Sequence, residues 1–290
     1  MAADGRTDRW LALLLALPAT ACVLLFVLLP ILCMALFSFW SIAPDGSIDR
    51  TLTLASWRQL FADGFYWSII GRTLVFAAGA TLATALVAYP CAIFLMLQPP
   101  ARRATLLLLL LIPSWISYVV RTMAWLPMLG RNGPINLLLL KAGLIAEPLD
   151  LLYGDGAVTL GMVQYLLPIV LLNIYLGLST IDPSLVAAAR SLGASPWRAF
   201  RAVTFPLALP ALSGACVLAF ILSMGAYITP LLLGGKDATY VSRLVYDEIV
   251  GQQNWPLGAA LATIIILLLT AMVALYGRFA GLGTLVRGRG

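Results

Sequence analysis

The segment DPSLVAAARSLGASPWRAFRAVTFPLALP, residues Asp182–Pro210, separates two strongly apolar runs and has the features of two short helices. Asp182 before a proline predicts an N-cap with proline at the first helical position, where its missing N–H costs nothing. Ser195 before a second proline repeats this signal. Gly193 predicts the end of the first helix, because glycine adopts positive φ without a steric penalty. The segment therefore predicts two capped helices joined at a glycine, outside the bilayer.

Each predicted helix has an apolar face and a basic edge. The first face consists of Leu185, Ala188, Ala189 and Leu192, at helical spacing. The second consists of Trp197, Phe200, Val203 and Thr204. We expect Trp197 and Phe200 to anchor the second helix by burial, and Pro206 and Pro210 to close the unit. The positive charges are Arg190, Arg198 and Arg201. Such a unit suits a soluble partner, although an ordinary basic loop between two spans has a similar composition.

The composition identifies an integral membrane protein. Of 290 residues, 62% are hydrophobic and 10% are charged, whereas soluble proteins carry about 25% charged residues. The net charge of +6 does not indicate nucleic acid, because the excess of basic residues lies on one side of the membrane. All four cysteines lie in apolar runs without the spacing of a metal site or a disulfide framework.

Six apolar runs approach or exceed the length of about 20 residues that a span needs. They cover roughly 10–39, 69–97, 104–128, 158–178, 207–233 and 257–276. The first run exceeds the apolar region of about 7–15 residues in a cleaved signal peptide, so we expect a retained helix. The fold class predicted is an all-α membrane protein, with a six-span domain over 10–278 and tails over 1–9 and 279–290.

Charges set the orientation. Six spans place both termini on one side, and that side carries ten Arg or Lys and three Asp, whereas the other side has seven bases and nine acids. The basic side is cytoplasmic by the positive-inside rule. The unit at 182–205, between spans four and five, is therefore predicted to be cytoplasmic.

The sequence offers no catalytic chemistry. It contains no GxxxxGK[ST] loop, no histidine that could serve as a base, and no metal-ligand cluster. We therefore expect no enzyme and no cofactor bound by this chain. If ATP drives its function, another chain hydrolyses it.

Polar residues within the spans are candidates for a translocation pathway. They are Ser114, Trp115, Tyr118, Arg121, Gln164, Tyr165, Asn173, Ser223, Tyr227 and Thr229. Arg121 is the one charge well inside an apolar run, where an ionisable group is costly and indicates function. Two alternatives stay open: Arg121 reaches the nearby surface, and the other residues form hydrogen bonds between helices.

The loop resembles the EAA loop of the membrane subunits of ABC importers. The matching positions are Ala188, Ala189, Gly193, Val203, Phe205 and Pro206, whereas Ala187 stands where that pattern has Glu. The resemblance implies coupling helices that fit a groove on a cytoplasmic ATPase. The coupling residues it implies, together with neighbouring charged and aromatic positions, are Ala188, Ala189, Arg190, Gly193, Trp197, Arg198, Phe200, Arg201 and Pro206.

Four further segments are similar to permease subunits of the spermidine/putrescine importer family. They are RTMAW (121–125), GRNGPIN (130–136), FILSMGAYITPLLLGG (220–235) and NWPLGAA (254–260). This resemblance implies a type I importer fold in a bacterial inner membrane and a polyamine-type cargo. It also implies a second homologous permease subunit, two copies of a P-loop ATPase carrying ATP and Mg, and a periplasmic binding protein.

Several alternatives remain at this point. A polyamine is a cation, yet the six predicted spans contain no Asp or Glu. Either aromatic residues and carbonyls contact the cation, or the partner permease supplies carboxylates, or the cargo is not a polyamine. Three other hypotheses for the protein are a homodimeric importer, an ion-coupled secondary transporter and a non-transporting scaffold. The scaffold leaves the polar residues of spans three to five unexplained.

Overall fold

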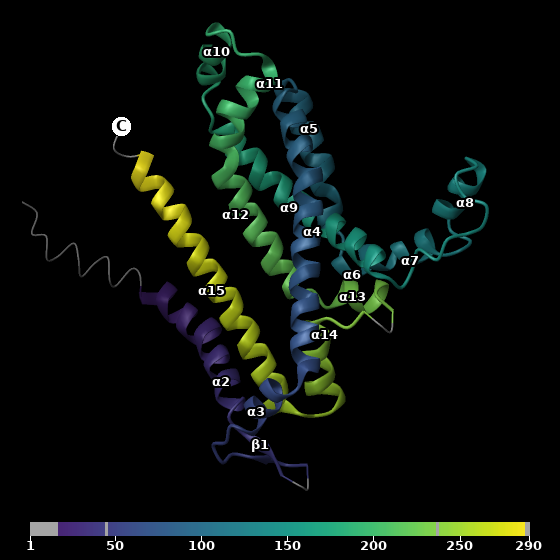
Figure 1. Ribbon diagram of the computed structural model, residues 1–290, viewed down its shortest axis with the longest axis vertical. Helices are drawn as coiled ribbons and strands as arrows, with labels where there is room; N and C mark the ends of the chain where they lie inside the picture. The colour runs from purple at the N-terminus through teal and green to yellow at the C-terminus, as the bar shows by residue number, and fades with distance from the viewer. Residues whose placement is uncertain (1–16, 44–45, 236–237, 288–290) are drawn as a thin grey trace, which may run out of the picture. The chain divides into compact units, whose positions relative to one another are not determined.

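The computed structural model describes residues 17–43, 46–235 and 238–287, with side chains described up to residue 278 (Figure 1). The predicted N-terminal tail, 1–9, and the first residues of span one lie outside this part. The chain divides into unit 1, residues 1–67 and 244–271, and unit 2, residues 68–243 and 272–290. Within the described residues, five helices have the length and composition of membrane spans, or six if one bent pair counts as a span.

Unit 1 contains the end of the first span and an amphipathic helix. The π-helical turn η1 (Leu24–Leu28) leads into α2 (Leu29–Phe37), and a two-residue hairpin pairs β1 (Ser41–Ile42) antiparallel with β2 (Ile48–Asp49). Helix α3 (Ala55–Ala62) buries Leu60 completely. The π-helical turn η4 (Asp247–Gly251) and the start of α15 (Trp255–Arg287) complete this unit.

Unit 2 holds the remaining helices. They are most of α4 (Gly64–Met96), then α5 (Pro100–Leu111), the 3₁₀ turn η2 (Ile112–Trp115), α6 (Tyr118–Met123), α7 (Trp125–Leu129), α8 (Pro134–Lys141), α9 (Asp155–Ser179), α10 (Pro183–Ser191), α11 (Pro196–Ala199), the π-helical turn η3 (Phe200–Thr204), α12 (Phe205–Met224) and α13 (Ile228–Leu233). Helix α14 (Val241–Tyr246) crosses the boundary between the units.

The core of unit 2 lies where α9 packs against α12. Helix α9 buries large residues such as Met162 and Ile174, whereas the buried residues of α12 include the alanines at 208, 215 and 219. A Cβ at Gly177 of α9 would lie 2.0 Å from the Cβ of Ala211 in α12, so only glycine allows this approach. Small residues at such crossings are typical of helix packing in membranes.

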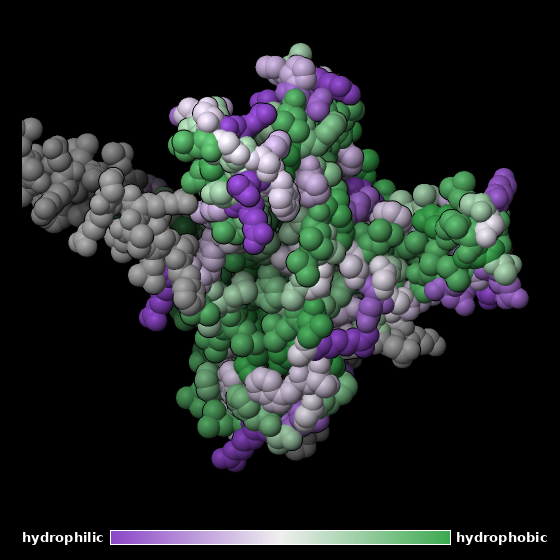
Figure 2. Space-filling model, turned by 45° about the horizontal axis from the view of Figure 1, so that its top comes forward, coloured by the Kyte–Doolittle hydropathy of each residue, from purple (hydrophilic) through white to green (hydrophobic). Residues whose placement is uncertain are grey.

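The outer surface is apolar, as lipid contact requires. Phe26 is 72% exposed, Val75 75% and Leu86 66%. Figure 2 shows hydrophobic residues over much of the face drawn, with hydrophilic residues in separate groups. A soluble protein rarely exposes so much contiguous apolar surface.

The span predicted for 104–128 is broken by a sharp bend in the structure. The helices Pro100–Trp115 and Tyr118–Lys141 meet at a bend of 94°. Pro113 cannot donate a backbone hydrogen bond, the helix tightens into η2, and Ile116 and Ser117 are extended, with ψ of 139° and 134°.

Spans five and six also differ from their predicted bounds. The predicted span 207–233 begins earlier, at Pro196, and ends at Met224, because the chain leaves the helix at Gly225 and resumes as the separate helix α13. Helix α15 continues to Arg287, so much of the predicted tail 279–290 is helical.

Candidate functional site

The loop at 182–205 has the two caps and the glycine turn that the sequence predicts. An Asp182 carboxylate oxygen accepts the Ser184 N–H at 2.8 Å, and the Ser195 hydroxyl oxygen accepts the Arg198 N–H at 3.3 Å. The hydrogen bonds from Ser184 hold the pKa of the Asp182 carboxyl below its usual value. Gly193 has φ of +85°. The loop conformation is therefore specified by residues inside the loop itself.

The turn at Gly193 is a Schellman motif. The Gly193 N–H donates to the Arg190 carbonyl at 3.0 Å, and the Ala194 N–H donates to the Ala189 carbonyl at 3.1 Å. This pair of hydrogen bonds satisfies carbonyls that the end of α10 leaves without helical partners. The motif fixes the angle between α10 and α11.

The second helix of the loop does not end where the sequence predicts. Residues Pro196–Met224 form one continuous helix, with Pro206 and Pro210 inside it. The π-helical turn η3 precedes Pro206, and the Phe205 N–H donates to the Phe200 carbonyl five residues earlier. A π turn accommodates the missing N–H and the bulk of proline without breaking the helix. The loop is thus rigidly continuous with span five.

The aromatic side chains of the loop divide into a packed and an exposed set. The Phe200 ring lies 6.2 Å from the Tyr89 ring of α4 and 6.1 Å from the Phe205 ring, so Phe200 anchors the helix. Trp197 stacks on Phe200 at 5.3 Å but is 69% exposed, which corrects the expected burial of Trp197.

The predicted apolar face of α10 has no covering partner among the described residues. Leu185 is 47% exposed and Leu192 is 89% exposed. Ala188, Arg190, Arg198 and Arg201 are exposed as well, and Ala189 is half-buried. Figure 1 shows α10 and α11 at the end of α12 opposite α13. The loop therefore presents apolar and basic side chains together on one end of unit 2.

A polar cluster lies near the break in span three. The Tyr118 hydroxyl of α6 shares a hydrogen bond with the Thr229 hydroxyl of α13, and the Tyr118 and Tyr165 rings lie 4.4 Å apart. The Trp125 indole N–H donates to the Gln164 side-chain oxygen at 2.9 Å. Four of the predicted pathway residues are thus brought together by α6, α9 and α13.

Arg121 lies one helical turn after Tyr118, on α6. Its Nε is buried and has no hydrogen-bond partner among the described residues. This arginine is half-buried rather than extended into solvent.

The remaining predicted pathway residues are not in this cluster. Ser114 and Trp115 lie in η2, before the break, and Trp115 is 85% exposed. Asn173 and Ser223 donate to carbonyls of their own helices, at 2.8 Å each, and Tyr227 is half-buried between α12 and α13. For Asn173 and Ser223, these bonds satisfy the side-chain donors within their own helices.

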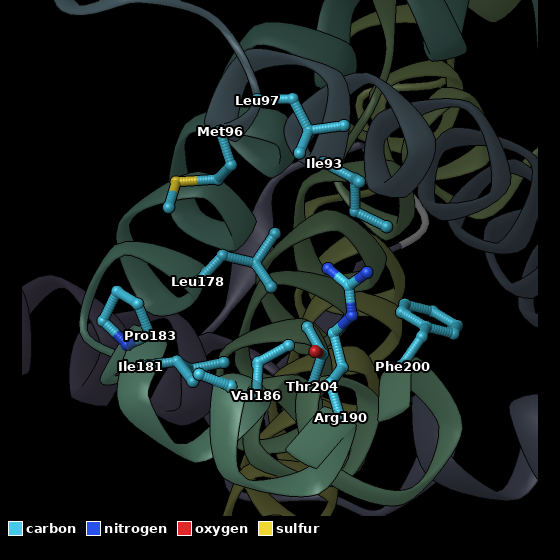
Figure 3. A pocket seen from close by; sticks show the side chains of 11 residues that line it. Ile93, Met96, Leu97, Leu178, Ile181, Pro183, Val186, Arg190, Phe200 and Thr204 are labelled. Carbon is cyan, nitrogen blue, oxygen red and sulfur yellow. The ribbon is translucent and has the colours of Figure 1, made fainter. Parts of the chain in front are cut away.

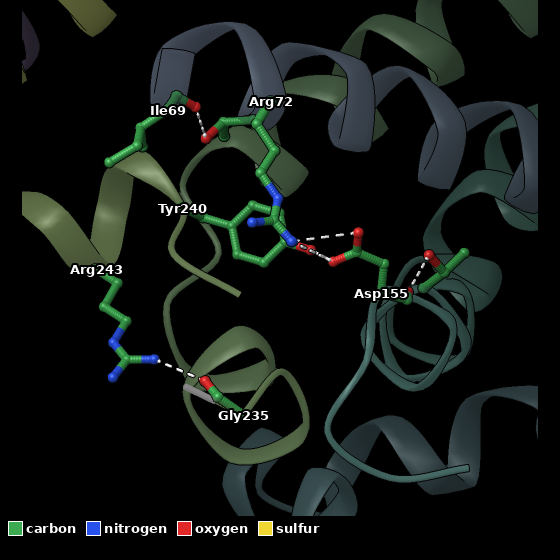
Figure 4. Close-up of polar contacts among 8 residues, drawn as sticks. Ile69, Arg72, Asp155, Gly235, Tyr240 and Arg243 are labelled. Carbon is green, nitrogen blue, oxygen red and sulfur yellow. Dashed lines mark hydrogen bonds and ion pairs between the residues drawn. The ribbon is translucent and has the colours of Figure 1, made fainter. Parts of the chain in front are cut away.

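A second polar site, absent from the sequence-based candidates, joins α4, α9 and the segment before α14 (Figure 4). Arg72 forms an ion pair with Asp155 at 3.1 Å and lies over the Tyr240 ring at 5.6 Å. The Tyr240 hydroxyl donates to Asp155 at 2.8 Å. Burial, and next the contact with Asp155, raise the pKa of Tyr240.

The backbone beside Tyr240 is also held. The Val241 N–H donates to the Thr73 hydroxyl at 3.0 Å, and Arg243 donates to the Gly235 carbonyl at 3.1 Å. The first bond ties the start of α14 to α4, and the second ties α14 to the turn at Gly235. In the sequence, the only signals of this site are the single charges of Arg72 and Asp155 at the ends of two apolar runs.

Comparisons with known proteins agree with this architecture. The sequence pattern of binding-protein-dependent transport system inner membrane components matches residues 8–281. The spermidine/putrescine transport system permease protein PotB of Escherichia coli K12 is 30% identical, over 88% of this chain and 93% of PotB. The inner membrane ABC transporter permease protein YdcU of the same organism is 31% identical, over 82% and 80% of the two chains.

A solved structure shows the same fold. It is a bacterial ABC transporter involved in the import of the acidic polysaccharide alginate, with a TM-score of 0.77 at 16% identity, over 94% of this chain and 96% of that chain. The sequence match covers nearly the whole chain, and the structure has the apolar spans and the fold of this transporter. The chain belongs to the family of binding-protein-dependent transport system inner membrane components, and its fold is that of an ABC importer permease.

Proposed function

We propose that this chain is the permease subunit of an ABC importer of polyamine-type cargo, such as spermidine or putrescine. A periplasmic binding protein delivers the cargo, and a separate P-loop ATPase, holding ATP and Mg, docks on the loop at 182–205. A second, homologous permease subunit completes the pathway, and both termini are cytoplasmic. The cargo assignment is supported by the similarity to PotB.

The observation that carries the coupling role is the continuity of the loop with span five. The helix from Pro196 to Met224 has no break. Phe200, near the start of this helix, packs against Tyr89 of α4. A displacement of the loop by the ATPase therefore moves α12 as a rigid rod. Its far end leads through Gly225 to α13, whose Thr229 bonds to Tyr118 in the polar cluster. Movement at the ATPase is thereby transmitted to the proposed pathway.

The proposed pathway contacts are aromatic and hydroxyl groups. Tyr118 and Tyr165, both half-buried, offer ring faces and hydroxyl oxygens, which suit ammonium groups by cation–π contact and hydrogen bonding, whereas the buried Thr229 holds the Tyr118 hydroxyl in place. A second candidate is an importer of the same class with another cargo. One observation favours it: among the described spans, the only acid is Asp155, at the first residue of α9, where Arg72 already neutralises it.

The test is reconstitution of this chain with its ATPase, its second permease and its binding protein. Arg198→Glu with Arg201→Glu reverses the exposed charge on the loop. We expect loss of ATPase retention and of uptake, with membrane insertion unchanged. Arg131→Glu is the matched control, since Arg131 is exposed and paired with Asp150 at 3.3 Å, outside the loop. Normal coupling in the loop variant would overturn the proposal.

A further inference from the structure

Two cavities of similar volume lie along α4, one toward each end. The first, of about 450 Å³, lies beneath α10 at the Met96 end of the helix and is mostly apolar, with Arg190 as its charged residue (Figure 3). The second, of about 440 Å³, lies between α4 and α9, and its lining includes Arg72, Val75, Phe76, Gly79, Asp155 and Thr159. The second cavity therefore combines a cation and an anion with apolar surface.

Helix length sets the depth of this charged pair in the membrane. Arg72 lies about 36 Å along α4 from its end at Met96, at 1.5 Å per residue. Asp155 lies about 36 Å along α9 from its end at Ser179. Arg103, which donates to the Met96 carbonyl at 3.0 Å, marks the headgroups at that end. Since the hydrocarbon core is about 30 Å thick, and about 40–45 Å with headgroups, the pair lies at the opposite headgroup level. In the proposed orientation this is the outer leaflet.

The apolar part of the cavity lies below the pair, toward the centre of the bilayer. Val75 and Gly79 follow Arg72 at about one and two helical turns along α4, and Thr159 follows Asp155 by one turn along α9. Val75 is 75% exposed, and a Cβ at the exposed Gly79 would meet no atom within 4 Å. The cavity therefore continues into the exposed apolar surface of α4, as the acyl chain of a lipid requires.

The ion pair presents both charges to a ligand. The side chains of Arg72 and Asp155 are 41% and 60% exposed. Their position is fixed from below by the buried Tyr240, whose hydroxyl donates to the Asp155 Oδ1 at 2.8 Å (Figure 4). A carboxylate accepts about four hydrogen bonds and a guanidinium has several N–H donors. A fixed cation beside a fixed anion matches a headgroup that carries a phosphate and an ammonium group.

We infer that this cavity binds a zwitterionic phospholipid of the phosphatidylethanolamine class. Its phosphate accepts hydrogen bonds from Arg72, its ammonium group donates to Asp155, and one acyl chain lies over Val75 and Gly79. A purely anionic headgroup fits less well, because Asp155 repels it, whereas the neutral ion pair matches a headgroup of zero net charge. A lipid in this position contacts both α4 and α9 and stabilises their packing.

The test is lipid binding to the purified complex, measured by native mass spectrometry. The complex is delipidated in detergent and titrated separately with phosphatidylethanolamine and phosphatidylglycerol. We expect Arg72→Gln to weaken binding of both lipids about tenfold or more, since a hydrogen bond to a charged group contributes about that factor. Asp155→Asn should weaken phosphatidylethanolamine binding alone, so that the preference between the two lipids is lost. Gly79→Leu fills the apolar part of the cavity and should weaken both.

Three further variants are controls. Arg72→Lys keeps the cation and should bind both lipids nearly as the wild type does. Arg131→Gln changes an exposed arginine whose ion pair with Asp150 lies outside the cavity, so lipid binding should stay unchanged. Ala78→Leu places a leucine beside Gly79, at an exposed position of α4 that does not line the cavity. Thermal unfolding of each variant without added lipid establishes that it is folded.

Three outcomes would overturn the inference. The first is that Arg72→Gln, Asp155→Asn and Gly79→Leu all bind both lipids as the wild type does. The second is that the wild type binds phosphatidylglycerol as tightly as phosphatidylethanolamine. The third is that Gly79→Leu releases a second permease subunit while lipid binding is unchanged, which would make the cavity a protein interface. Each readout is independent of import, so the proposed function is decided by its own test.

Discussion

Gly193 gives the sharpest prediction, because its cost of substitution is set by the backbone alone. Its φ of +85° lies in the left-handed region, and a Cβ there would meet no atom within 4 Å. For an L-residue that region costs about 1–2 kcal/mol, less for Asn and more for a β-branched residue. A cost of this size lowers the equilibrium constant for forming the native turn about 5–30-fold. We therefore expect activity in the order Gly, Asn, Ala, Val.

The assay is ATP hydrolysis stimulated by the cargo-loaded binding protein in the reconstituted importer. Gly193→Val should hydrolyse ATP at a small fraction of the wild-type stimulated rate while reaching the membrane in normal amounts. Gly71→Ala is the control, since Gly71 also has no atom within 4 Å of a new Cβ but has an ordinary helical φ. Wild-type coupling in Gly193→Val, or a Gly193→Asn variant weaker than Gly193→Val, would show that coupling does not depend on the left-handed turn.

Three further predictions concern stability. Tyr118→Phe leaves the buried Thr229 hydroxyl without its partner. The free energy of unfolding should fall by about 1–3 kcal/mol, measured by thermal unfolding in detergent. An unchanged unfolding temperature would contradict the contact. Gly161→Ala places a Cβ 2.8 Å from the Thr229 methyl and should destabilise by about 1–3 kcal/mol, whereas Gly156→Ala, which meets nothing within 4 Å, should not. The cap at Asp182 stabilises α10 at pH values above the usual carboxyl pKa of 3.8, and this stabilisation is lost as the pH falls through the lowered pKa of Asp182. Hydrogen exchange of the α10 amides should show this loss. Asp182→Asn should remove the pH dependence.

Local rules made the loop predictable. An N-cap needs one side-chain oxygen and the N–H two or three residues later, and a Schellman turn needs one glycine, so Asp182, Ser195 and Gly193 are readable from their neighbours alone. The apolar spans are readable for a similar reason, since the bilayer demands about 20 apolar residues.

Proline was misleading at the start of span five. Pro206 and Pro210 read as helix stops, yet the helix continues because η3 shifts the hydrogen bonding to Phe205 and Phe200. A π turn leaves no distinct signal in residue type. Whether a proline ends or merely bends a helix depends on packing against other segments, here on Tyr89.

Hydropathy could not reveal the two breaks within spans. The extended residues Ile116 and Ser117, and the turn at Gly225, lie inside apolar runs that average to membrane-like values. Their positions depend on contacts such as Tyr118 with Thr229, between residues 111 positions apart. For this reason the pathway candidates of span three are divided between two helices, with Ser114 and Trp115 in η2 and Tyr118 and Arg121 in α6.

The site formed by Arg72, Asp155 and Tyr240 shows the same limit. The bonded pairs are 83 and 85 positions apart, and each residue alone is an unremarkable loop or span-end residue. Only the packing of α4 beside α9 brings the charges together. The buried Tyr240 ring then completes a contact that no local pattern predicts.

Uptake of labelled spermidine and putrescine into proteoliposomes measures import by the reconstituted complex. We expect the complete complex to accumulate one of these cargoes only with hydrolysable ATP and the binding protein present. We also expect Arg198→Glu with Arg201→Glu to abolish uptake without removing the permease from the membrane. ATP-dependent accumulation of neither cargo would remove the polyamine assignment, and uptake along an ion gradient by this chain alone would contradict the proposed importer function.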